Sequence, residues 1–164
     1  MKMIGLKTAV LIACSAKMGA LIAGCDEKTC KAFYDFGYNL GLAFQIADDY
    51  LDNYADEKVF GKPIGGDIVN SKKSWLTVRA LEKTGDKEAF FNAMAMPAST
   101  AEEKALKIAA VKSIYDRLGV ADDAKAEIVR FNDLAIEAVS GIGLDAAKMD
   151  ILRTFADKLV GRAK

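Results

Sequence analysis

The sequence contains no histidine, and this absence excludes more chemistry than any other feature of the composition. Ser-His-Asp catalysis, Cys-His catalysis and imidazole metal sites all need a histidine, so none of them can form within this chain. The charges also balance, with 23 Lys and Arg against 23 Asp and Glu. Zero net charge argues against nucleic-acid binding, which depends on many contacts between basic side chains and phosphates. Polar chemistry is left to carboxylates, amines, amides and hydroxyls.

Cysteine and proline are also scarce. The three cysteines, Cys14, Cys25 and Cys30, are odd in number and lack C-x-x-C spacing. A disulfide framework or a zinc site is therefore disfavoured, and reduced thiols in a cytoplasmic protein are expected. Only two prolines stand against 13 glycines, which favours long uninterrupted helices. No segment alternates apolar and polar residues for long enough to predict a strand.

The N-terminal segment from Met1 to Ala23 is strongly apolar, so a membrane anchor and a signal peptide must both be weighed. Lys7 and Lys17 interrupt it, whereas a membrane-spanning helix needs about 20 apolar residues. A signal peptide would suit the length of the apolar run, but Lys17 and the helical pattern beyond it fit poorly. We therefore predict a buried core helix and no membrane span, with a targeting segment as the alternative.

Helical periodicity and capping signals predict an all-α chain. The predicted helices cover residues 4–23, 26 or 29 to 54, 68–83, 85 to just before Pro97, 99–118, 122 to about 141, and 145–160. Residues 61–67 hold three glycines and a proline and are predicted as a loop. Ser99 and Glu102 are interpreted as a capping box. Without an internal repeat or a long linker, residues 1–164 are predicted to form a single helical domain of about six to seven helices.

The most distinctive chemical feature is a turn with three carboxylates, Asp48, Asp49 and Asp52, late in the helix that ends near residue 54. Like charges at helical spacing destabilise a helix by roughly 0.2–0.5 kcal/mol per pair. Mg²⁺ compensates such a cluster, and it takes only one or two carboxylates while water and substrate phosphates fill its shell. The alternative is a solvated acidic turn, which the apolar flanks and Gln45 one turn earlier disfavour. We therefore predict Mg²⁺ together with a phosphate-bearing substrate.

Several lysines accompany the acidic helix in the sequence. Lys7 precedes Thr8 within the apolar first helix, Lys62 lies in the glycine-rich loop, and Lys72 and Lys73 follow that loop. Lysines supply point charges for phosphate oxygens, and glycines let a backbone approach closely. Each lysine alone is better explained as an ordinary surface residue. Their arrangement around one acidic helix favours a phosphate site.

Residues 41–52, followed by Gly61-Lys62-Pro63-Ile64-Gly65-Gly66-Asp67, resemble the second aspartate-rich region of the trans-isoprenyl diphosphate synthases. That family includes farnesyl, geranylgeranyl and longer-chain polyprenyl synthetases. Lys7-Thr8-Ala9 matches the K-T-A element of the family, and residues 152–162 are similar to its closing helix. The first aspartate-rich motif and the arginines after it have no counterpart here, and Gly66 stands where the family often has lysine. The chain therefore resembles the C-terminal half of a synthase, a truncated helical bundle of the isoprenoid synthase type.

The resemblance implies Mg²⁺-dependent condensation of an allylic diphosphate with isopentenyl diphosphate. The implied catalytic residues are Lys7, Thr8, Gln45 and Lys62, the metal ligands are Asp48, Asp49 and Asp52, and the substrate-binding residues are Phe44 and Lys72. It also implies a homodimer or pairing with a missing N-terminal half, and the isolated half is expected to be inactive. The alternative function is a non-catalytic helical module that pairs with a complete synthase. A terpene cyclase is disfavoured, because an aspartate motif followed by the Lys62 loop is the synthase pattern.

Overall fold

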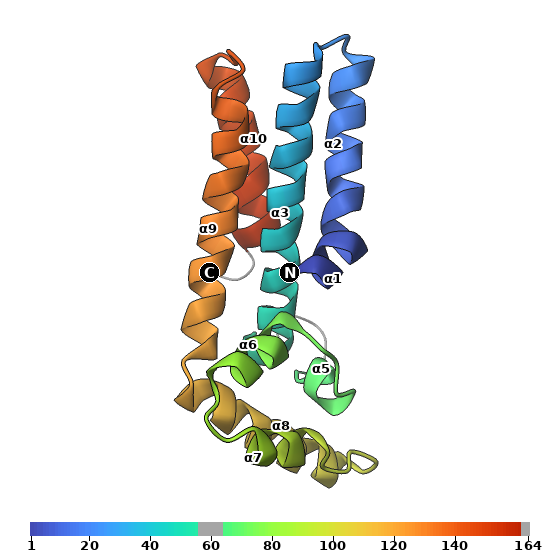
Figure 1. The fold of residues 1–164 in the computed structure, drawn as a ribbon, viewed down its shortest axis with the longest axis vertical. Coiled ribbons are helices and arrows are strands. Elements are labelled where there is room, and N and C mark those ends of the chain that lie inside the picture. The colour runs from blue at the N-terminus through green and yellow to red at the C-terminus, as the bar shows by residue number, and fades with distance from the viewer. Residues whose placement is uncertain (56–63, 162–164) are drawn as a thin grey trace. The chain divides into compact units, whose positions relative to one another are not determined.

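The computed structural model describes residues 1–55 and 64–161, and within these ranges it contains helices and no strands (Figure 1). The chain divides into two compact units. Unit 1 comprises residues 1–47 and 126–164, and unit 2 comprises residues 48–125. The boundaries fall inside two long helices, α3 (Glu27–Tyr54) and α9 (Val120–Ser140). The all-α prediction is therefore confirmed.

Unit 1 contains the N-terminal helices, the first part of α3, most of α9 and the last helix. The first predicted helix is confirmed but not uniform, because α1 (Lys2–Ile4) passes through a π-helical turn, η1 (Gly5–Ala9), into α2 (Val10–Ile22). Gly24 follows α2 with φ of 74°, as expected for a glycine after a helix. The Asp26 carboxylate accepts a hydrogen bond from Thr29 N at 2.8 Å and caps α3. The last helix, α10, covers Ala146–Val160.

Glycines on α3 allow α3 to pack closely against η1 and α2. A Cβ atom on Gly41 would lie 2.5 Å from Ala9 Cα, and one on Gly37 would lie 2.8 Å from Ala13 Cα. These distances are shorter than a real Cβ contact, so only glycine permits the observed separation of the backbones. Ala9 and Ala13 are fully buried in this contact. The contact fixes η1 beside the middle of α3.

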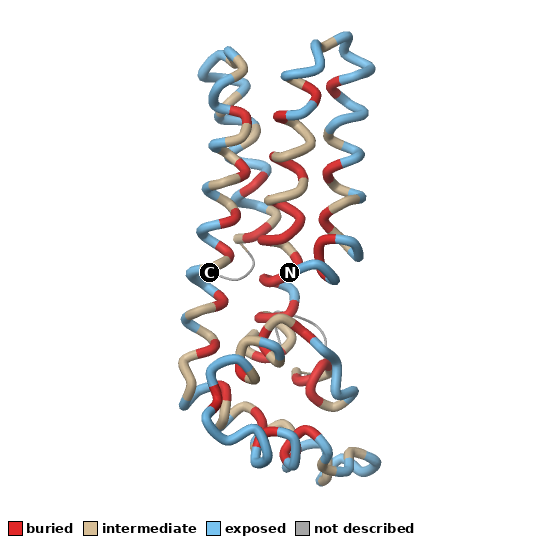
Figure 2. Tube along the Cα trace, in the orientation of Figure 1, coloured by how far each residue is buried: buried red, intermediate tan, exposed pale blue. Residues whose placement is uncertain are grey.

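The opposite face of the N-terminal helix is exposed. Leu11, Met18 and Ile22 on α2 are 72%, 58% and 84% exposed, and buried positions recur along only one side of the helix (Figure 2). By length and composition alone, residues Lys2–Ile22 are long and apolar enough to cross a membrane, a test that core helices of soluble proteins also pass. The absence of a membrane span stays a prediction.

Unit 2 is built from short helices around α8 (Ala101–Arg117). The other helices are α5 (Gly66–Val69), α6 (Trp75–Lys83) and α7 (Lys87–Met94), and each packs against α8. Leu76, Phe90, Val111 and Tyr115 form the fully buried centre of this unit. A long helix thus serves as the support on which three short helices are placed.

The prediction of one helix over 68–83 is wrong, because α5 and α6 are separated by residues 70–74. Ser71 adopts a left-handed conformation with φ of 50°, which ends α5. Ser74 then starts α6, and its hydroxyl accepts a hydrogen bond from Thr77 N. The predicted loop over 61–67 is also partly wrong, because Gly66 and Asp67 belong to α5. Gly65 precedes α5 with φ of 83°.

The predicted capping box is displaced by one residue. Thr100, not Ser99, accepts the hydrogen bond, from Glu103 N at 3.2 Å, and the Glu103 carboxylate accepts one from Thr100 N at 3.0 Å. The same Glu103 carboxylate also accepts a hydrogen bond from Ser99 N, which is why both registers fit the sequence. The predicted start of the next helix at residue 122 is wrong as well, since α9 begins at Val120.

Candidate functional site

Two of the predicted site residues in unit 1, Thr8 on η1 and Gln45 on α3, are joined by a hydrogen bond. Thr8 Oγ1 donates to Gln45 Oε1 at 2.6 Å, and Gln45 is 5% exposed. The Ala9–Gly41 contact lies one turn earlier on α3, so the close approach of the backbones brings these two side chains within reach. Single π-helical turns inside α-helices occur frequently at functional sites. The structure therefore brings two of the predicted catalytic residues together.

The other two predicted site residues of unit 1, Lys7 and Phe44, are less buried than Gln45. Lys7 is exposed and forms no ion pair with any residue that the structure describes. Phe44 is half-buried and precedes Gln45 on α3. An exposed ammonium next to Thr8 is free to bind an anion, and a half-buried ring can contact an apolar ligand. Both residues keep their predicted roles as hypotheses.

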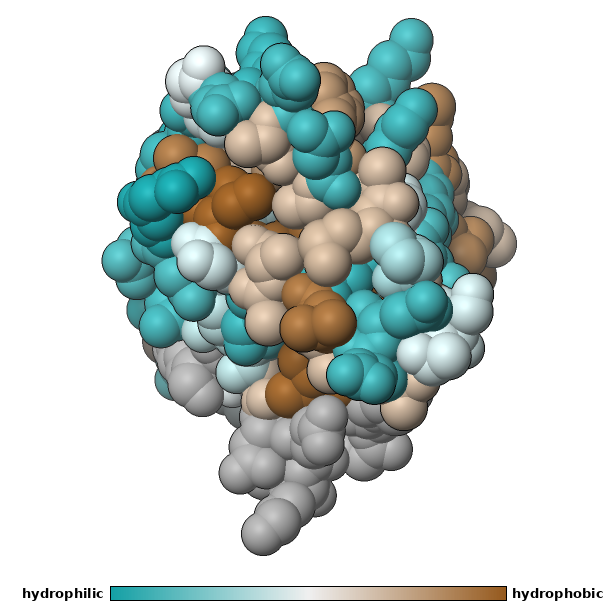
Figure 3. Space-filling model, turned by 90° about the horizontal axis from the view of Figure 1, so that it is seen from below, coloured by the Kyte–Doolittle hydropathy of each residue, from teal (hydrophilic) through white to brown (hydrophobic). Residues whose placement is uncertain are grey.

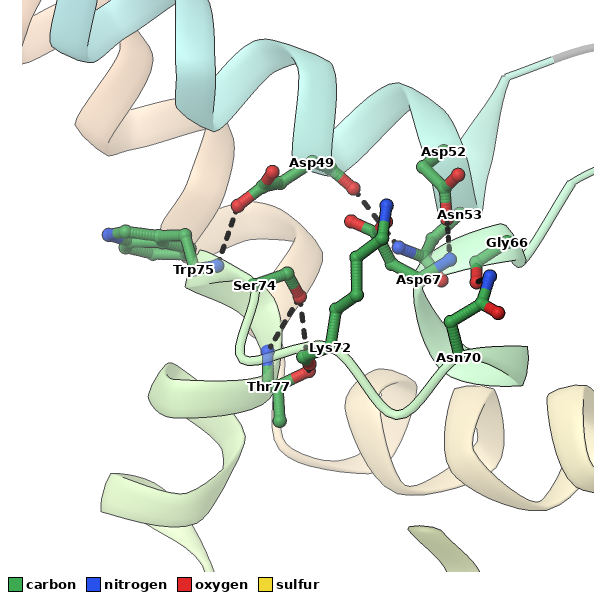
Figure 4. A network of polar contacts seen from close by, with 10 residues as sticks. All are labelled: Asp49, Asp52, Asn53, Gly66, Asp67, Asn70, Lys72, Ser74, Trp75 and Thr77. Carbon is green, nitrogen blue, oxygen red and sulfur yellow. Dashed lines mark hydrogen bonds and ion pairs between the residues drawn. The ribbon is translucent and has the colours of Figure 1, made fainter. Parts of the chain in front are cut away.

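The three aspartates of the acidic turn have different surroundings. Asp48 is exposed and makes no hydrogen bond or ion pair within the described part of the chain. Asp49 is 5% exposed, and its Oδ2 accepts a hydrogen bond from Trp75 N at 2.6 Å (Figure 4). Asp49 therefore caps the first turn of α6, where the amide groups have no partner within the helix. Of these two carboxylates, Asp48 is the one available to a ligand.

The burial of Asp52 is intermediate between that of Asp48 and that of Asp49. It is half-buried, and its Oδ2 accepts a hydrogen bond from Asp67 N at 2.8 Å. Burial raises the pKa of the Asp52 carboxyl, and the hydrogen bond from Asp67 N partly offsets that effect. A Cβ atom on Gly66 would lie 3.1 Å from Asp52 Oδ1, so the glycine leaves room beside this oxygen. Oδ2 of Asp52 therefore accepts a hydrogen bond, whereas Oδ1 accepts none from the described residues.

Lys72 lies next to the acidic turn and is fixed at both ends by Asp67. Its backbone N donates to Asp67 O at 2.9 Å, and its Nζ donates to Asp67 Oδ1 at 2.6 Å (Figure 4). The hydrogen bond to Asp67 is the main cause of the raised pKa of Lys72, and the Asp52 and Asp49 carboxylates raise it further. The Lys72 ammonium therefore lies close enough to Asp67, Asp52 and Asp49 to interact with their carboxylates.

Asp67 is a further residue of this site that the sequence patterns did not predict. The residue is 7% exposed, and it contacts Asp52 through its backbone and Lys72 through its side chain. The only signal for it in the sequence is its position directly after Gly65-Gly66. Lys62, the remaining predicted residue, lies outside the residues that the structure describes.

The acidic turn suits a cation that is only partly bound by protein. Among the described residues, no three His, Cys, Asp or Glu side chains converge to hold a metal ion by themselves. Mg²⁺ needs less than this, because it usually takes one or two carboxylates and keeps water and substrate phosphates as its other ligands. Asp48 and the free Oδ1 of Asp52 are one helical turn apart on α3. This donor set fits Mg²⁺ shared with a phosphate group.

Comparison with known proteins gives a consistent result. The sequence profile of the polyprenyl synthetases matches residues 1–114. The geranylfarnesyl diphosphate synthase of Aeropyrum pernix is 34% identical over 165 residues, which cover 100% of this chain and 50% of that protein. A crystal structure of a geranylgeranyl pyrophosphate synthase matches with a TM-score of 0.89 at 36% identity, over 99% of this chain and 50% of the other.

A third similar protein was crystallised with ligands. It is the geranylgeranyl pyrophosphate synthase of Corynebacterium glutamicum, complexed with isoprenyl diphosphate and magnesium. It matches with a TM-score of 0.74 at 26% identity, over 88% of this chain and 40% of the other. The chain thus spans about half the length of the curated relatives that it matches along its full length.

Proposed function

Since the chain belongs to the polyprenyl synthetase family, we propose that it forms the C-terminal half of a prenyltransferase, as one helical domain. The reaction of the whole enzyme is the condensation of an allylic diphosphate with isopentenyl diphosphate. This chain contributes a site for Mg²⁺ and the diphosphate group. Without the first aspartate-rich motif it holds the metal from one side only, so the isolated chain binds these ligands without turning them over.

One observation carries the proposal. Asp48, Asp52 and the Lys72 ammonium lie in the same region of unit 2, and Asp48 has no other partner among the described residues. Carboxylates bind the metal, and the ammonium binds phosphate oxygens that the metal leaves exposed. A purely structural acidic turn would pair its carboxylates with cations or helix ends, as Asp49 does. Asp48 is instead exposed and unpaired among the described residues, and the Lys72 ammonium is exposed although it also donates to Asp67.

The chemistry in this proposal is electrostatic. Mg²⁺ supplies positive charge to a diphosphate leaving group. Asp48 and Asp52 would orient it, and Lys72 would contact phosphate oxygens, which stabilises the charge that develops as the carbon–oxygen bond breaks. Lys7, in unit 1, keeps the diphosphate-binding role that the family resemblance implies for it. Thr8 and Gln45 form a fixed polar pair for the reacting carbons, and Phe44 lines the apolar part of the isopentenyl diphosphate site. No step needs a histidine.

Isothermal titration of the chain with Mg²⁺ and isopentenyl diphosphate, then with geranyl diphosphate, tests the proposal. We expect binding that requires Mg²⁺ and that falls about tenfold or more in Asp48→Asn. Asp133→Asn is the matched control, because Asp133 is also an exposed aspartate inside a helix, and we expect unchanged binding. No binding by the unmodified chain, or equal losses in both variants, would contradict the proposal.

The second candidate function is a non-catalytic module that pairs with a complete synthase. Exposed apolar side chains favour it, because Leu11 and Ile22 in unit 1 and Phe91 and Leu106 in unit 2 are more than half exposed. Apolar groups also gather among hydrophilic ones on the face seen in Figure 3. Apolar patches of this kind are often interaction surfaces. Binding of a full-length synthase without any binding of Mg²⁺ and diphosphate would favour this candidate.

Two further expectations belong to the proposal. All three cysteines are free thiols in the structure, which supports a cytoplasmic location. The exposed apolar faces support association, either as a homodimer or with the half of the enzyme that this chain lacks.

A further inference from the structure

A buried lysine on α8 has no function in the reaction proposed above. Lys107 is 3% exposed, and no carboxylate pairs with it among the described residues. Its Nζ donates to Ser71 Oγ at 2.8 Å and to Val69 O at 3.4 Å. Lysine is almost never fully buried without a charged partner, because an ammonium loses its hydration there. A residue in this unfavourable position needs an explanation.

Both partners of Lys107 lie at the end of α5, where the chain reverses its direction. Ser71 N donates to Ile68 O at 3.0 Å, and Lys72 N donates to Asp67 O at 2.9 Å. These two hydrogen bonds form a Schellman motif, whose left-handed position is usually occupied by glycine. Ser71 occupies it with φ of 50°, a conformation that a residue with a Cβ atom adopts unfavourably. Something outside the motif must therefore hold Ser71 there.

The hydroxyl of Ser71 supplies that restraint. It donates to Met94 O at 3.1 Å and accepts the hydrogen bond from Lys107 Nζ. The serine is thus fixed by α7 and α8 at once. The next residue is Lys72, whose ammonium reaches Asp67 Oδ1 at 2.6 Å. The conformation of Ser71 consequently determines where the Lys72 side chain starts.

The same helix also anchors the segment beyond Lys72. Thr77 Oγ1 donates to Lys72 O at 3.0 Å and lies 2.9 Å from the hydroxyl of Tyr115. Lys107, Val111 and Tyr115 are the buried residues of α8, and one turn separates each from the next. Two polar residues of α8 therefore hold the segment before and after Lys72, with an apolar residue between them.

We propose that Lys107 is a positioning residue for Lys72. By fixing Ser71 in the left-handed conformation, it presents the Lys72 ammonium beside Asp52 and Asp67, where a metal-bound diphosphate would be contacted. The proposal rests on the proposed function for the role of Lys72. The placement of Lys72 itself is independent of any ligand, so it is tested separately.

The first test compares Lys107→Met with Val111→Ala. Both change the buried face of α8, but only Lys107→Met removes the hydrogen bond to Ser71. We expect amide hydrogen exchange at Lys72 to accelerate about tenfold or more in Lys107→Met, relative to Val111→Ala at matched thermal stability. Affinity for Mg²⁺ with inorganic pyrophosphate should fall at least several-fold in Lys107→Met alone. Equal exchange rates at Lys72 in the two variants would overturn the proposal.

The second test substitutes Ser71 itself, which is an exposed residue, so the variants are expected to fold. Ser71→Ala and Ser71→Gly both lose the hydroxyl, but only glycine favours a positive φ. We expect the affinity for pyrophosphate to fall in Ser71→Ala. The affinity of Ser71→Gly should be higher than that of Ser71→Ala. The double variant Ser71→Gly with Lys107→Met should recover most of the affinity lost in Lys107→Met. If Lys107 instead acts by its charge on the ligand, glycine will not restore the affinity, and the proposal is wrong.

The two proposals fail in different ways. If the unmodified chain does not bind Mg²⁺ with pyrophosphate, the proposed function is contradicted. The exchange rate at the Lys72 amide still decides whether Lys107 positions that residue. If binding occurs and neither the exchange rate nor the affinity responds to Lys107→Met, only the positioning role is overturned.

Discussion

The two units of the molecule place their functional side chains by different physical means. In unit 1, long helices approach closely through small residues, and the Ala9–Gly41 contact sets the position of Thr8 relative to Gln45. In unit 2, short helices are held by hydrogen bonds between side chains and backbone. Asp49 holds the start of α6, and Asp52 holds the start of α5.

This difference means that the acidic turn has two tasks. Asp52 is proposed to bind the metal and also holds the start of α5, and Asp49 holds the start of α6. Asp48, the other proposed metal ligand, forms no hydrogen bond with either helix among the described residues. Lys72 is brought beside the turn by the same hydrogen bonds, through Asp67. In unit 1, by contrast, the residues that set the packing and the residues proposed for the reaction are different. In unit 1, a substitution should therefore change either the stability or the binding of ligands. In unit 2, one substitution can change both.

The largest effect is expected for Gly41→Ala in unit 1. The added Cβ atom would lie 2.5 Å from Ala9 Cα, so the helices must move apart. We expect a loss of about 2–3 kcal/mol in the free energy of unfolding, measured by denaturant titration. Gly19→Ala is the matched control, because nothing lies within 4 Å of its added Cβ atom in α2. The control should be stabilised by roughly 0.5–1 kcal/mol, and equal effects would refute packing by small residues.

In unit 2, Asp49→Ala and Asp48→Ala should differ although they are neighbours. Asp49→Ala leaves Trp75 N without its acceptor, and we expect a loss of about 1–2 kcal/mol in unfolding free energy. Asp48→Ala should leave thermal stability unchanged and weaken binding of Mg²⁺ with a diphosphate. Thermal melts and titrations of the two variants check this pair of outcomes. A destabilised Asp48→Ala protein would show that the acidic turn is structural throughout.

Much of unit 1 could be predicted from the sequence because it follows regular rules. A helical period and the glycine after residue 23 predict α2 and its end. The K-T-A element indicates Thr8, whose hydroxyl donates to Gln45 in the structure. Unit 2 depends on contacts between distant residues, which a local pattern does not contain. The bend at Ser71 is the clearest case, because its left-handed conformation is held by Lys107 and Met94 from two other helices. Asp67 was missed for the same reason.

A smaller change in stability distinguishes whether Thr100 or Ser99 caps the start of α8. Thr100→Ala removes the acceptor for Glu103 N, and we expect a loss of about 1 kcal/mol in unfolding free energy. Ser99→Ala should change stability by less than about 0.5 kcal/mol, because Ser99 contributes only its backbone N–H to Glu103. Denaturant titrations of both variants compare the two registers. A larger loss in Ser99→Ala would restore the register predicted from the sequence.

The smallest effect is expected where α6 meets the start of α9 in unit 2. Lys83 Nζ and Arg79 Nε both donate to Asp123 Oδ2, at 2.7 Å and 2.8 Å. These interactions lower the pKa of Asp123 below its ordinary value of 3.8, and the hydrogen bond from Lys83 is the main cause. A lowered carboxyl pKa adds stability above the unfolded-state value, and this stability is lost as pH falls through the folded-state value. Asp123→Asn should therefore cost less than about 1 kcal/mol at pH 7, since these side chains are partly exposed. Measured by thermal unfolding across acidic pH, the difference from the unmodified chain should shrink toward zero below the ordinary pKa of aspartate. A difference that stays constant with pH would mean that the ion pairs do not contribute.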